Sequence, residues 1–295
     1  MPDAIGNKAA HDYHLDIAPV QEGFYVTGAA HCDWGMKNRL GKMFDPRSGN
    51  TVMLAFDHGY IMGATAGLER MDVTIAPLCR YADVLMATRG AIRSCIPPTV
   101  HNAICLRATH DASVLIDDMS TGNGVGADME AAIRMNASAV AIQCFIGGAG
   151  EARSLETLCR AVDAGERYGI PVLGVTAVGK EMARTTQYFL LAARMLAELG
   201  ASFVKTYYCD DFEKVVAACP VPIVIAGGKK LPEDEALTMA YRAISDGARG
   251  VDMGRNIFQS EHPAAMCRAV AKIVHEKFTD REAFQFYQEL AAQDN

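Results

Sequence analysis

The sequence of 295 residues has no apolar run long enough to cross a bilayer, because Arg, Lys, Asp or Gly interrupts its most apolar segments. The first residues, MPDAIGNKAAHDYHLD, are polar, so we expect neither a signal peptide nor a membrane anchor. The chain also lacks a basic excess: its formal net charge is −7. A general nucleic-acid binder is usually basic, so we expect no nucleic-acid partner.

No C-x-x-C pair occurs among the nine cysteines, whose number is odd. Most of them lie in apolar segments, as Cys79, Cys105, Cys144, Cys219 and Cys267 do. This pattern favours reduced cysteines in the core of a cytoplasmic protein and argues against a structural zinc site. We therefore expect no bound metal.

What the chain does contain is a repeated alternation. Eight apolar runs centre near residues 52, 84, 104, 139, 172, 204, 223 and 251, and amphipathic segments such as SLETLCRAVDAGERYG and TTQYFLLAARMLAELG lie between most of them. Eight strand–helix alternations predict a closed (β/α)8 barrel of the α/β class. The alternative is an open doubly wound sheet, but AFDHGY after the first strand is not its glycine fingerprint.

The barrel pattern begins only at Thr51, and no low-complexity linker divides the chain. We interpret residues 1–50 as an N-terminal arm or cap, and residues 51–295 as the barrel with C-terminal helices. The arm contains the single tryptophan, Trp34, together with Met36, Leu40, Met43 and Phe44. This apolar content predicts an assembly role, in a homo-oligomer.

Charged residues gather where the predicted strands end, which is where barrel enzymes have their active sites. The first strand ends in Asp57 and His58, two residues of acid–base type, although an Asp-containing turn would read the same way. Arg89 and Arg107 stand at the second and third tips. They are candidates to steer an anionic substrate, unless they pack against helix carboxylates.

The seventh and eighth tips, AGGKK and MGRN, predict a phosphate site. Loops after these two strands of a barrel often bind phosphate through backbone N–H groups. The residues that would do so are Gly227, Gly228, Gly254 and Arg255.

Lys205 lies inside the apolar strand GASFVKTYY, where an ammonium group is unusual. Burial would lower the pKa of the lysine, and a neutral amine can attack a ketone to form a Schiff base. The alternatives are an ion pair with a carboxylate such as Asp57, or a side chain that reaches the barrel mouth.

Four segments, LAFDHGY, FVKTYY, VIAGGKK and GVDMGRNIFQ, occur in the order and at the spacing of a known family. From about Thr51 to Gln259 the chain resembles the class I aldolases of the archaeal fructose-bisphosphate type. The resemblance implies that Lys205 forms the Schiff base, that Asp57 is the strand-one aspartate, and that the glycine tips bind phosphate. It implies no bound cofactor.

A further likeness, in DWGMKNRL, GLERMDVTIAPL and CPVPIVIAGGKKLPEDEAL, is to the thiolase branch of this family, which degrades phosphorylated autoinducer-2. It implies transfer of an acetyl group from 3-hydroxy-5-phosphonooxypentane-2,4-dione to coenzyme A, giving acetyl-CoA and dihydroxyacetone phosphate. Coenzyme A would be a co-substrate, and the sequence identifies no site for it. Relatives form rings of subunits, a decamer among the sizes considered.

The chain departs from the aldolase pattern at Phe145, where aldolase relatives place a tyrosine acid–base group. Phenylalanine cannot transfer a proton, so we expect weak or absent cleavage of fructose 1,6-bisphosphate, unless Tyr207, His58 or a water substitutes. The alternatives to a thiolase are a class I aldolase, a transaldol synthase that makes an aminodideoxyheptulosonate, and a non-catalytic sugar-phosphate sensor.

Overall fold

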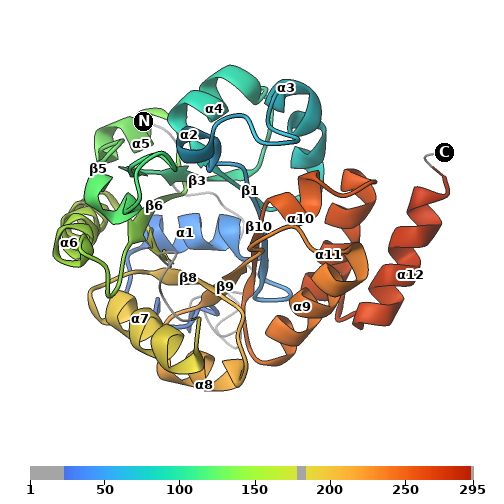
Figure 1. Cartoon of the computed structure of the whole chain (residues 1–295). Coiled ribbons are helices and arrows are strands. Elements are labelled where there is room, and N and C mark those ends of the chain that lie inside the picture. The colour runs from blue at the N-terminus through green and yellow to red at the C-terminus, as the bar shows by residue number, and fades with distance from the viewer. Residues whose placement is uncertain (1–22, 178–183, 294–295) are drawn as a thin grey trace, which may run out of the picture.

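The computed structural model describes residues 23–177 and 184–293 of the chain. In this part, eight parallel strands close into a barrel in the order β1-β10-β9-β8-β7-β6-β3-β2 (Figure 1). The predicted (β/α)8 barrel is confirmed, and the alternative of an open sheet is wrong. The barrel strands are β1 (Thr51–Ala55), β2 (Val84–Thr88), β3 (Ala103–Arg107), β6 (Ala139–Cys144), β7 (Val172–Thr176), β8 (Phe203–Tyr207), β9 (Ile223–Ala226) and β10 (Gly250–Met253).

Helices surround the barrel, and a small antiparallel hairpin, β4 (Thr109–His110) with β5 (Gly124–Val125), stands in the connection between β3 and β6. The short helical elements are α2 (Gly59–Met62), α3 (Met71–Thr74), η1 (Ala76–Tyr81), α4 (Arg89–Cys95), η2 (Met119–Gly122), α5 (Met129–Arg134), α8 (Phe212–Ala218) and α10 (Arg255–Phe258). The longer helices are α1 (Trp34–Met43), α6 (Glu151–Tyr168), α7 (Thr186–Glu198), α9 (Glu233–Ser245), α11 (Pro263–Glu276) and α12 (Asp280–Ala291).

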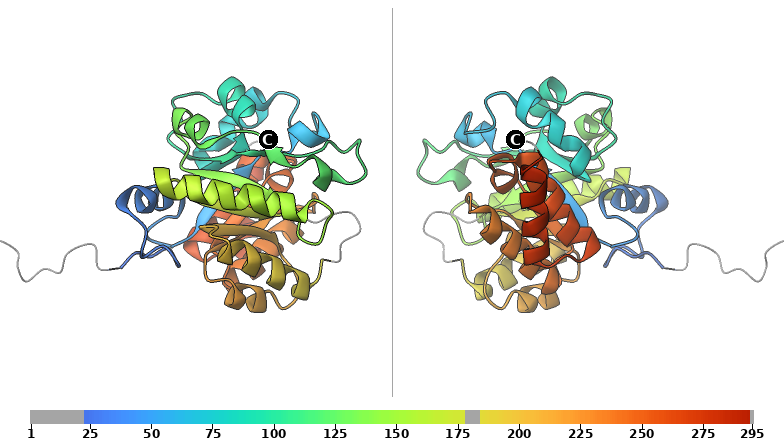
Figure 2. Two further views of the ribbon diagram at one scale, coloured as in Figure 1. Left: turned by 90° about the vertical axis from the view of Figure 1, so that its left-hand side faces the viewer. Right: turned by 90° about the vertical axis from the view of Figure 1, so that its right-hand side faces the viewer.

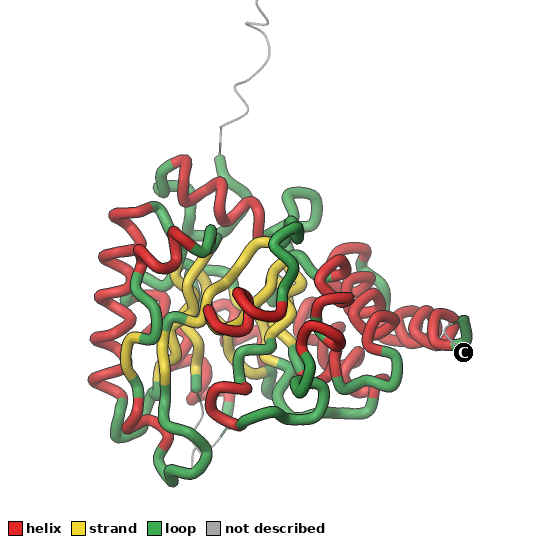
Figure 3. Tube along the Cα trace, turned by 90° about the horizontal axis from the view of Figure 1, so that it is seen from above, coloured by secondary structure: helices red, strands yellow, loops and turns green. Residues whose placement is uncertain are grey.

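Local sequence explains where the long helices begin and end. Helix α9 follows Pro232 and has three acids in its first turn, which complement the positive end of the helix dipole. Helix α6 ends at Gly169, whose φ of 66° closes the helix in the left-handed region. Helix α12 begins with a capping box between Thr279 and Glu282. It packs on α11 and α9 and projects from one side of the barrel (Figure 3).

Helix α1 closes the N-terminal end of the barrel, on the side opposite the β4–β5 hairpin (Figure 2). Leu40, Met43 and Phe44 are fully buried there, against inward-facing residues at the starts of the strands. The Phe44 ring meets that of Phe203 on β8 edge-on, at 5.6 Å between centroids. Of the arm's five apolar residues named above, only Trp34 is largely exposed, at 67%.

The arm thus provides a plug for its own barrel, which removes much of the apolar surface on which we based an assembly role. Residues 1–22 of the predicted arm lie outside the described residues. The division of the chain at residue 50 stays a prediction.

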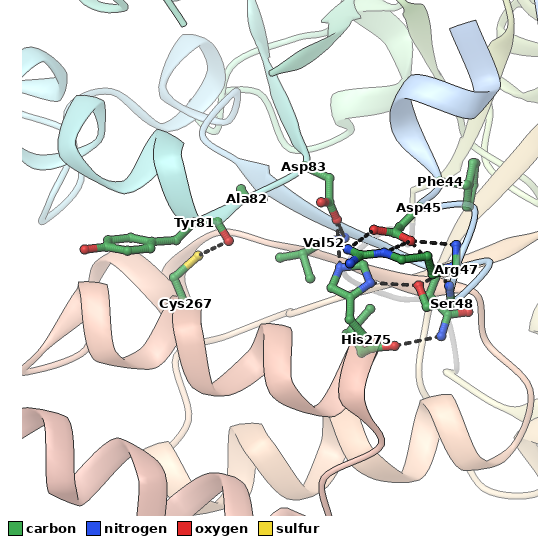
Figure 4. A network of polar contacts seen from close by, with 12 residues as sticks. Phe44, Asp45, Arg47, Ser48, Val52, Tyr81, Ala82, Asp83, Cys267 and His275 are labelled. Atoms are coloured by element: carbon green, nitrogen blue, oxygen red, sulfur yellow. Dashed lines mark hydrogen bonds and ion pairs between the residues drawn. The ribbon is translucent and has the colours of Figure 1, made fainter. Parts of the chain in front are cut away.

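Polar contacts fasten the same end of the barrel from outside (Figure 4). His275 on α11 contacts Asp83 Oδ2 at 2.9 Å and Ser48 Oγ at 2.8 Å, through its two ring nitrogens. The backbone N–H of Val52 donates to the same Asp83 oxygen at 2.7 Å, and the Asn50 amide donates to the Val274 carbonyl at 2.8 Å. These bonds fix α11 to the entry of β1, far along the strands from their carboxyl ends.

Inside the barrel, the character of the residues changes along each strand. The interior near the N-terminal end is apolar, with Ala103, Ala139, Leu173 and Phe203 in the same buried cluster as α1. Because side chains alternate, the following inward positions include a cation on β3 and on β8 and an acid on β10. The barrel therefore carries its ionisable groups toward the carboxyl ends of the strands.

Candidate active site

A cavity of about 230 Å³ opens at the carboxyl ends of the strands. Seven of the eight barrel strands, or the loops that follow them, contribute to its wall. Its lining residues are Ala55, Asp57, His58, Ile61, Met62, Arg107, Met119, Gln143, Val175, Thr176, Ala177, Lys205, Tyr207, Ala226, Gly227, Gly228, Asp252, Gly254 and Arg255. A larger cavity, of about 670 Å³, lies near the strand starts around Lys42 and Asp83, away from these groups. Because barrel active sites lie at the carboxyl ends, the smaller cavity is the candidate.

Lys205 points into this cavity and forms an ion pair with Asp252 of β10. Its Nζ lies 2.8 Å from Asp252 Oδ2, with the lysine side chain 11% exposed and the aspartate side chain fully buried. Nζ also lies 3.6 Å from the sulfur of Met86 on β2. Of the alternatives raised for Lys205, an ion pair with a carboxylate is present, but the partner is Asp252 and not Asp57.

Asp252 is the site residue that the sequence reasoning missed. In the barrel it is in register with Ala226 of β9. The signal was present: GVDMG places one acid inside an apolar strand, as FVKTY places one lysine. Two such interior charges of opposite sign, on strands separated only by β9, predict an ion pair.

The pair shifts both groups from their ordinary titration ranges. Burial lowers the pKa of Lys205, but the carboxylates of Asp252 and Asp57 outweigh it, so the pKa is raised from 10.5. The expectation of a lowered lysine pKa is therefore wrong for the protein without substrate. Burial raises the pKa of Asp252 from 3.8, against the opposing effect of Lys205.

Asp57 and Arg107 form a second buried pair beside the first. The Nε and one terminal nitrogen of Arg107 each lie 2.7 Å from Asp57 Oδ2, and both side chains are 6% exposed. Arg107 also donates to Thr109 Oγ1 at 3.5 Å. Burial raises the pKa of Asp57, but Arg107 and Lys205 outweigh it and hold the pKa below 3.8. Arg107 lines the cavity, where its charge is balanced by Asp57, and its anion-steering role stays a prediction.

His58 follows directly and is a half-buried wall residue. Its ring is stacked on Phe258 of α10 at 5.8 Å between centroids, and its Nε2 lies 3.3 Å from Thr65 Oγ1. Burial lowers the pKa of His58 from 6.5, with Arg255 and Lys205 acting in the same direction and Asp57 opposing. The imidazole is therefore neutral near pH 7 and able to accept a proton.

The glycine tips after β9 and β10 adjoin each other as predicted. A guanidinium nitrogen of Arg255 donates to the Gly228 carbonyl at 2.6 Å, and the Asn256 amide donates to the Gly227 carbonyl at 2.7 Å. Gly228 has φ +68°, a conformation that side chains disfavour, and a Cβ there would make only ordinary contact with the Tyr207 ring, at 3.9 Å. At Gly254 a Cβ would lie 2.2 Å from the Ala55 carbonyl oxygen, so the close approach of β10 to β1 needs glycine.

Two residues singled out in the sequence lie away from the cavity. Arg89 is exposed at the start of α4 and is not among the lining residues, and its steering role stays a prediction. Phe145 is 3% exposed and also does not line the cavity. Its backbone N–H donates to Ser154 Oγ at 3.1 Å, and Gln143, two residues earlier, takes the wall position.

Other classes of site are not found in the described residues. Within residues 23–177 and 184–293, no three His, Cys, Asp or Glu side chains gather as a metal site. None of the helices in that part of the chain combines the length and apolarity of a membrane span. All nine cysteines are free thiols.

A parallel barrel with two buried ion pairs at its carboxyl mouth has the architecture of an α/β-barrel enzyme. Residues 51–260 match the model of the DeoC/LacD family aldolases. The chain belongs to this family, and the resemblance that we inferred from about Thr51 to Gln259 is confirmed. It is an enzyme of a class I aldolase family.

Several relatives match the chain along nearly its full length. It is 53% identical over 290 residues to the 3-hydroxy-5-phosphonooxypentane-2,4-dione thiolase of Enterobacter sp. (strain 638), with 98% of each chain covered. It is 54% identical over 291 residues to the protein of the same name from Klebsiella pneumoniae, again with 98% of each covered. Among solved structures, it is similar to an archaeal fructose 1,6-bisphosphate aldolase, with a TM-score of 0.72 and 25% identity over 82% of this chain and 99% of that one.

Proposed function

We propose that the protein is a thiolase that moves the acetyl group of 3-hydroxy-5-phosphonooxypentane-2,4-dione to coenzyme A, in the degradation of autoinducer-2. The observation that carries this proposal is Lys205, the lysine that lines the mouth cavity of a chain half identical to thiolases of that name. In this reaction Lys205 attacks the ketone beside the phosphate-bearing carbon. Loss of water then gives an iminium, which withdraws electrons from the neighbouring carbon–carbon bond.

The thiol of coenzyme A supplies the second nucleophile. It reacts as the thiolate, and the neutral imidazole of His58 is the proposed base that takes its proton. The thiolate adds to the acetyl carbonyl, the bond to the next carbon breaks, and acetyl-CoA leaves. The electron pair forms an enamine on Lys205. The proton held by His58 then returns to the enamine carbon, and water hydrolyses the iminium to give dihydroxyacetone phosphate.

Asp57 is the second candidate for proton transfer, as the sequence suggested. Its Oδ2 already accepts both contacts from Arg107, and its pKa is held below the usual range. A carboxylate in this state is a weak base near pH 7. The geometry therefore favours His58 for the thiol, with Asp57 and Arg107 as the fixed charges against which substrate hydroxyls are oriented.

The phosphate would lie at the adjoining glycine tips. Gly227, Gly228 and Gly254 line the cavity without side chains, so backbone N–H groups are open to a close ligand. Arg255 supplies a cation at the same place, already oriented by its bond to the Gly228 carbonyl. This arrangement supports a phosphorylated substrate.

The volume of the cavity limits how much of coenzyme A can enter it. Its volume, about 230 Å³, falls below the ~300–1,000 Å³ of pockets that hold drug-sized ligands. A small keto-phosphate fits such a space, whereas the whole of coenzyme A does not. We infer that coenzyme A is a co-substrate whose thiol end enters the mouth, with no cofactor held permanently.

Covalent trapping tests the proposal. Borohydride with dihydroxyacetone phosphate should add the ligand's mass to the peptide that contains Lys205, as read by mass spectrometry. Lys205→Arg should lose both the adduct and turnover, because guanidinium stays protonated. The matched control is Lys229→Arg, an exposed lysine of the neighbouring loop, which should keep both. An adduct on Lys229 or Lys230, or turnover that needs no coenzyme A, would contradict the proposal.

A class I aldolase is the second candidate, favoured by the likeness to the archaeal fructose 1,6-bisphosphate aldolase and by the presence of Tyr207 in the cavity wall. Tyr207 offers the hydroxyl that Phe145 lacks. Cleavage of fructose 1,6-bisphosphate at a rate equal to that of the thiolase reaction, unaffected by coenzyme A, would decide for it. Tyr207→Phe should then abolish that cleavage.

We also infer a cytoplasmic homo-oligomer larger than a dimer. The nine free thiols suit a reducing compartment. In the arm, Trp34 is the large apolar side chain left most exposed by the plug. Light scattering at micromolar concentration measures the subunit number directly, and a monomer mass would refute the oligomer.

A further inference from the structure

The buried carboxylate of Asp252 is only partly paired with other groups of the protein. Its side chain is fully buried, and Oδ2 forms the ion pair with Lys205. Neither carboxylate oxygen has a hydrogen-bond partner among the described residues, so Oδ2 has only the ion pair and Oδ1 has no polar contact. A buried carboxylate without full pairing costs free energy that an apolar residue would not. Because Asp252 lies beside the nucleophile in the wall of the cavity, a role in the reaction would explain why an acid is present there.

We propose that Asp252 is the catalytic residue that takes and returns the protons of Schiff-base chemistry at Lys205, an inference that rests on the proposed function. Asp252 first removes a proton from the ammonium, leaving a neutral amine and a carboxylic acid. The amine attacks the ketone, a proton moves from nitrogen to the alkoxide, and a carbinolamine results. The acid then donates its proton to the carbinolamine hydroxyl, which leaves as water. The products are an iminium and the original carboxylate.

The contacts favour Asp252 over the other groups of the cavity for this role. Asp57 is occupied by Arg107, which holds its carboxylate ionised. The orientation of the His58 ring is fixed by its stacking on Phe258 and its contact with Thr65. Asp252 alone among these groups touches the reacting nitrogen, at 2.8 Å.

Charge balance supports the same assignment. The lysine nitrogen is cationic as the ammonium and again as the iminium, and the carboxylate lies beside it in both states. Between them, the neutral amine coexists with the neutral acid, so the buried site never holds an unpaired charge. Burial raises the pKa of Asp252, which favours the acid form relative to an exposed aspartate.

The experiment follows formation of the borohydride-trapped adduct, with dihydroxyacetone phosphate as the probe and without coenzyme A. Asp252→Asn should slow adduct formation by about 10²–10⁴-fold, the usual contribution of general acid–base catalysis. Asp252→Ala should be slowed likewise and then accelerated by added formate, which can occupy the vacated space. Asp83→Asn removes a carboxylate paired with His275 at the opposite end of the barrel, and it should trap at the parent's rate.

A pH profile of trapping reports how Asp252 affects the protonation of the Lys205 amine. The charged and titratable groups around the pair are Asp57 and His58 after β1, and Cys105 and Arg107 on β3. Because Asp252 raises the pKa of Lys205, Asp252→Asn should move the acid limb of the profile to lower pH. The limb reports the protonation of the amine, whereas formate rescue of Asp252→Ala reports the proton transfer, which a residue that only held the lysine in place would not show.

The outcomes also separate this inference from the proposed function. If the parent forms no adduct on Lys205, the proposed function fails. If the parent traps and Asp252→Asn traps equally fast with an unchanged profile, only the inference fails. Circular dichroism spectra identical to the parent's show that each variant is folded, and formate rescue of Asp252→Ala supports the inference if the Asn variant proves too unstable to assay.

Discussion

Replacing Lys205 with methionine should leave the Asp252 carboxylate buried without its ion-pair partner. Methionine has a similar length but no charge, so a fully buried acid would lose the partner now 2.8 Å away. Removing one member of a buried ion pair typically destabilises a protein by about 3–5 kcal/mol. We expect the free energy of unfolding of Lys205→Met to fall by an amount in this range, measured by urea denaturation at pH 7.

The loss should depend on pH in a defined direction. Burial already raises the pKa of Asp252 above 3.8, and removal of the lysine raises it further. The folded variant then binds a proton that the unfolded chain releases, so its stability declines as pH rises from about 3.8 through the folded pKa. The deficit relative to the parent should therefore be small in acid and largest near neutrality.

A double variant provides the control. Adding Asp252→Asn to Lys205→Met removes the stranded charge and should restore much of the lost stability, because the effects of two contacting residues are coupled by about 0.5–3 kcal/mol. If the two substitutions are simply additive, or if the deficit of Lys205→Met is the same at every pH, the pair does not contribute to stability as we argue.

Three further perturbations test other parts of the structure. Gly228→Ala should cost about 1–2 kcal/mol of backbone strain and raise KM for the phosphorylated substrate, while Gly254→Ala should lower the melting temperature much more, because its Cβ would meet the Ala55 carbonyl at 2.2 Å; an unchanged KM in the first variant would place the phosphate elsewhere. Leu40→Ala should destabilise by about 2–5 kcal/mol in thermal or urea unfolding, as expected for a core leucine, and Trp34→Ala should be close to neutral; equal losses would contradict the plug. Phe145→Tyr should gain no aldolase activity and should lose about 1–3 kcal/mol, since its hydroxyl would be buried without a partner; cleavage of fructose 1,6-bisphosphate by this variant would show that the position faces substrate.

The barrel was predictable because its signal is local and repeated. Each strand is a short apolar run ending in polar or glycine residues, and this pattern places Asp57, Lys205 and the glycine tips at one end of the fold. The helices with clear start and stop residues, such as Pro232 before α9, also agree. These features depend on a few neighbouring residues, which the sequence displays directly.

Pairing across the barrel was harder to predict, because it depends on register. Lys205 lies level with Val224 on β9, and Asp252 lies level with Ala226, so only the assembled sheet brings the two charges together. The arm illustrates the same limit. Its apolar residues predict burial. Only the folded barrel shows that Leu40 and Phe44 are buried against residues of the same chain, at the N-terminal end of the barrel.

The two carboxylates of the mouth show how one barrel can divide acid–base work. Asp57 and Asp252 are both buried, so burial alone would raise both pKa values. Arg107 reverses the effect at Asp57 through two contacts to one oxygen, whereas at Asp252 the single contact with Lys205 does not. Titratable groups pushed apart in this way commonly have different roles. A permanently ionised Asp57 balances charge and orients, while Asp252, whose partner is consumed when the lysine reacts, is the group placed to exchange protons.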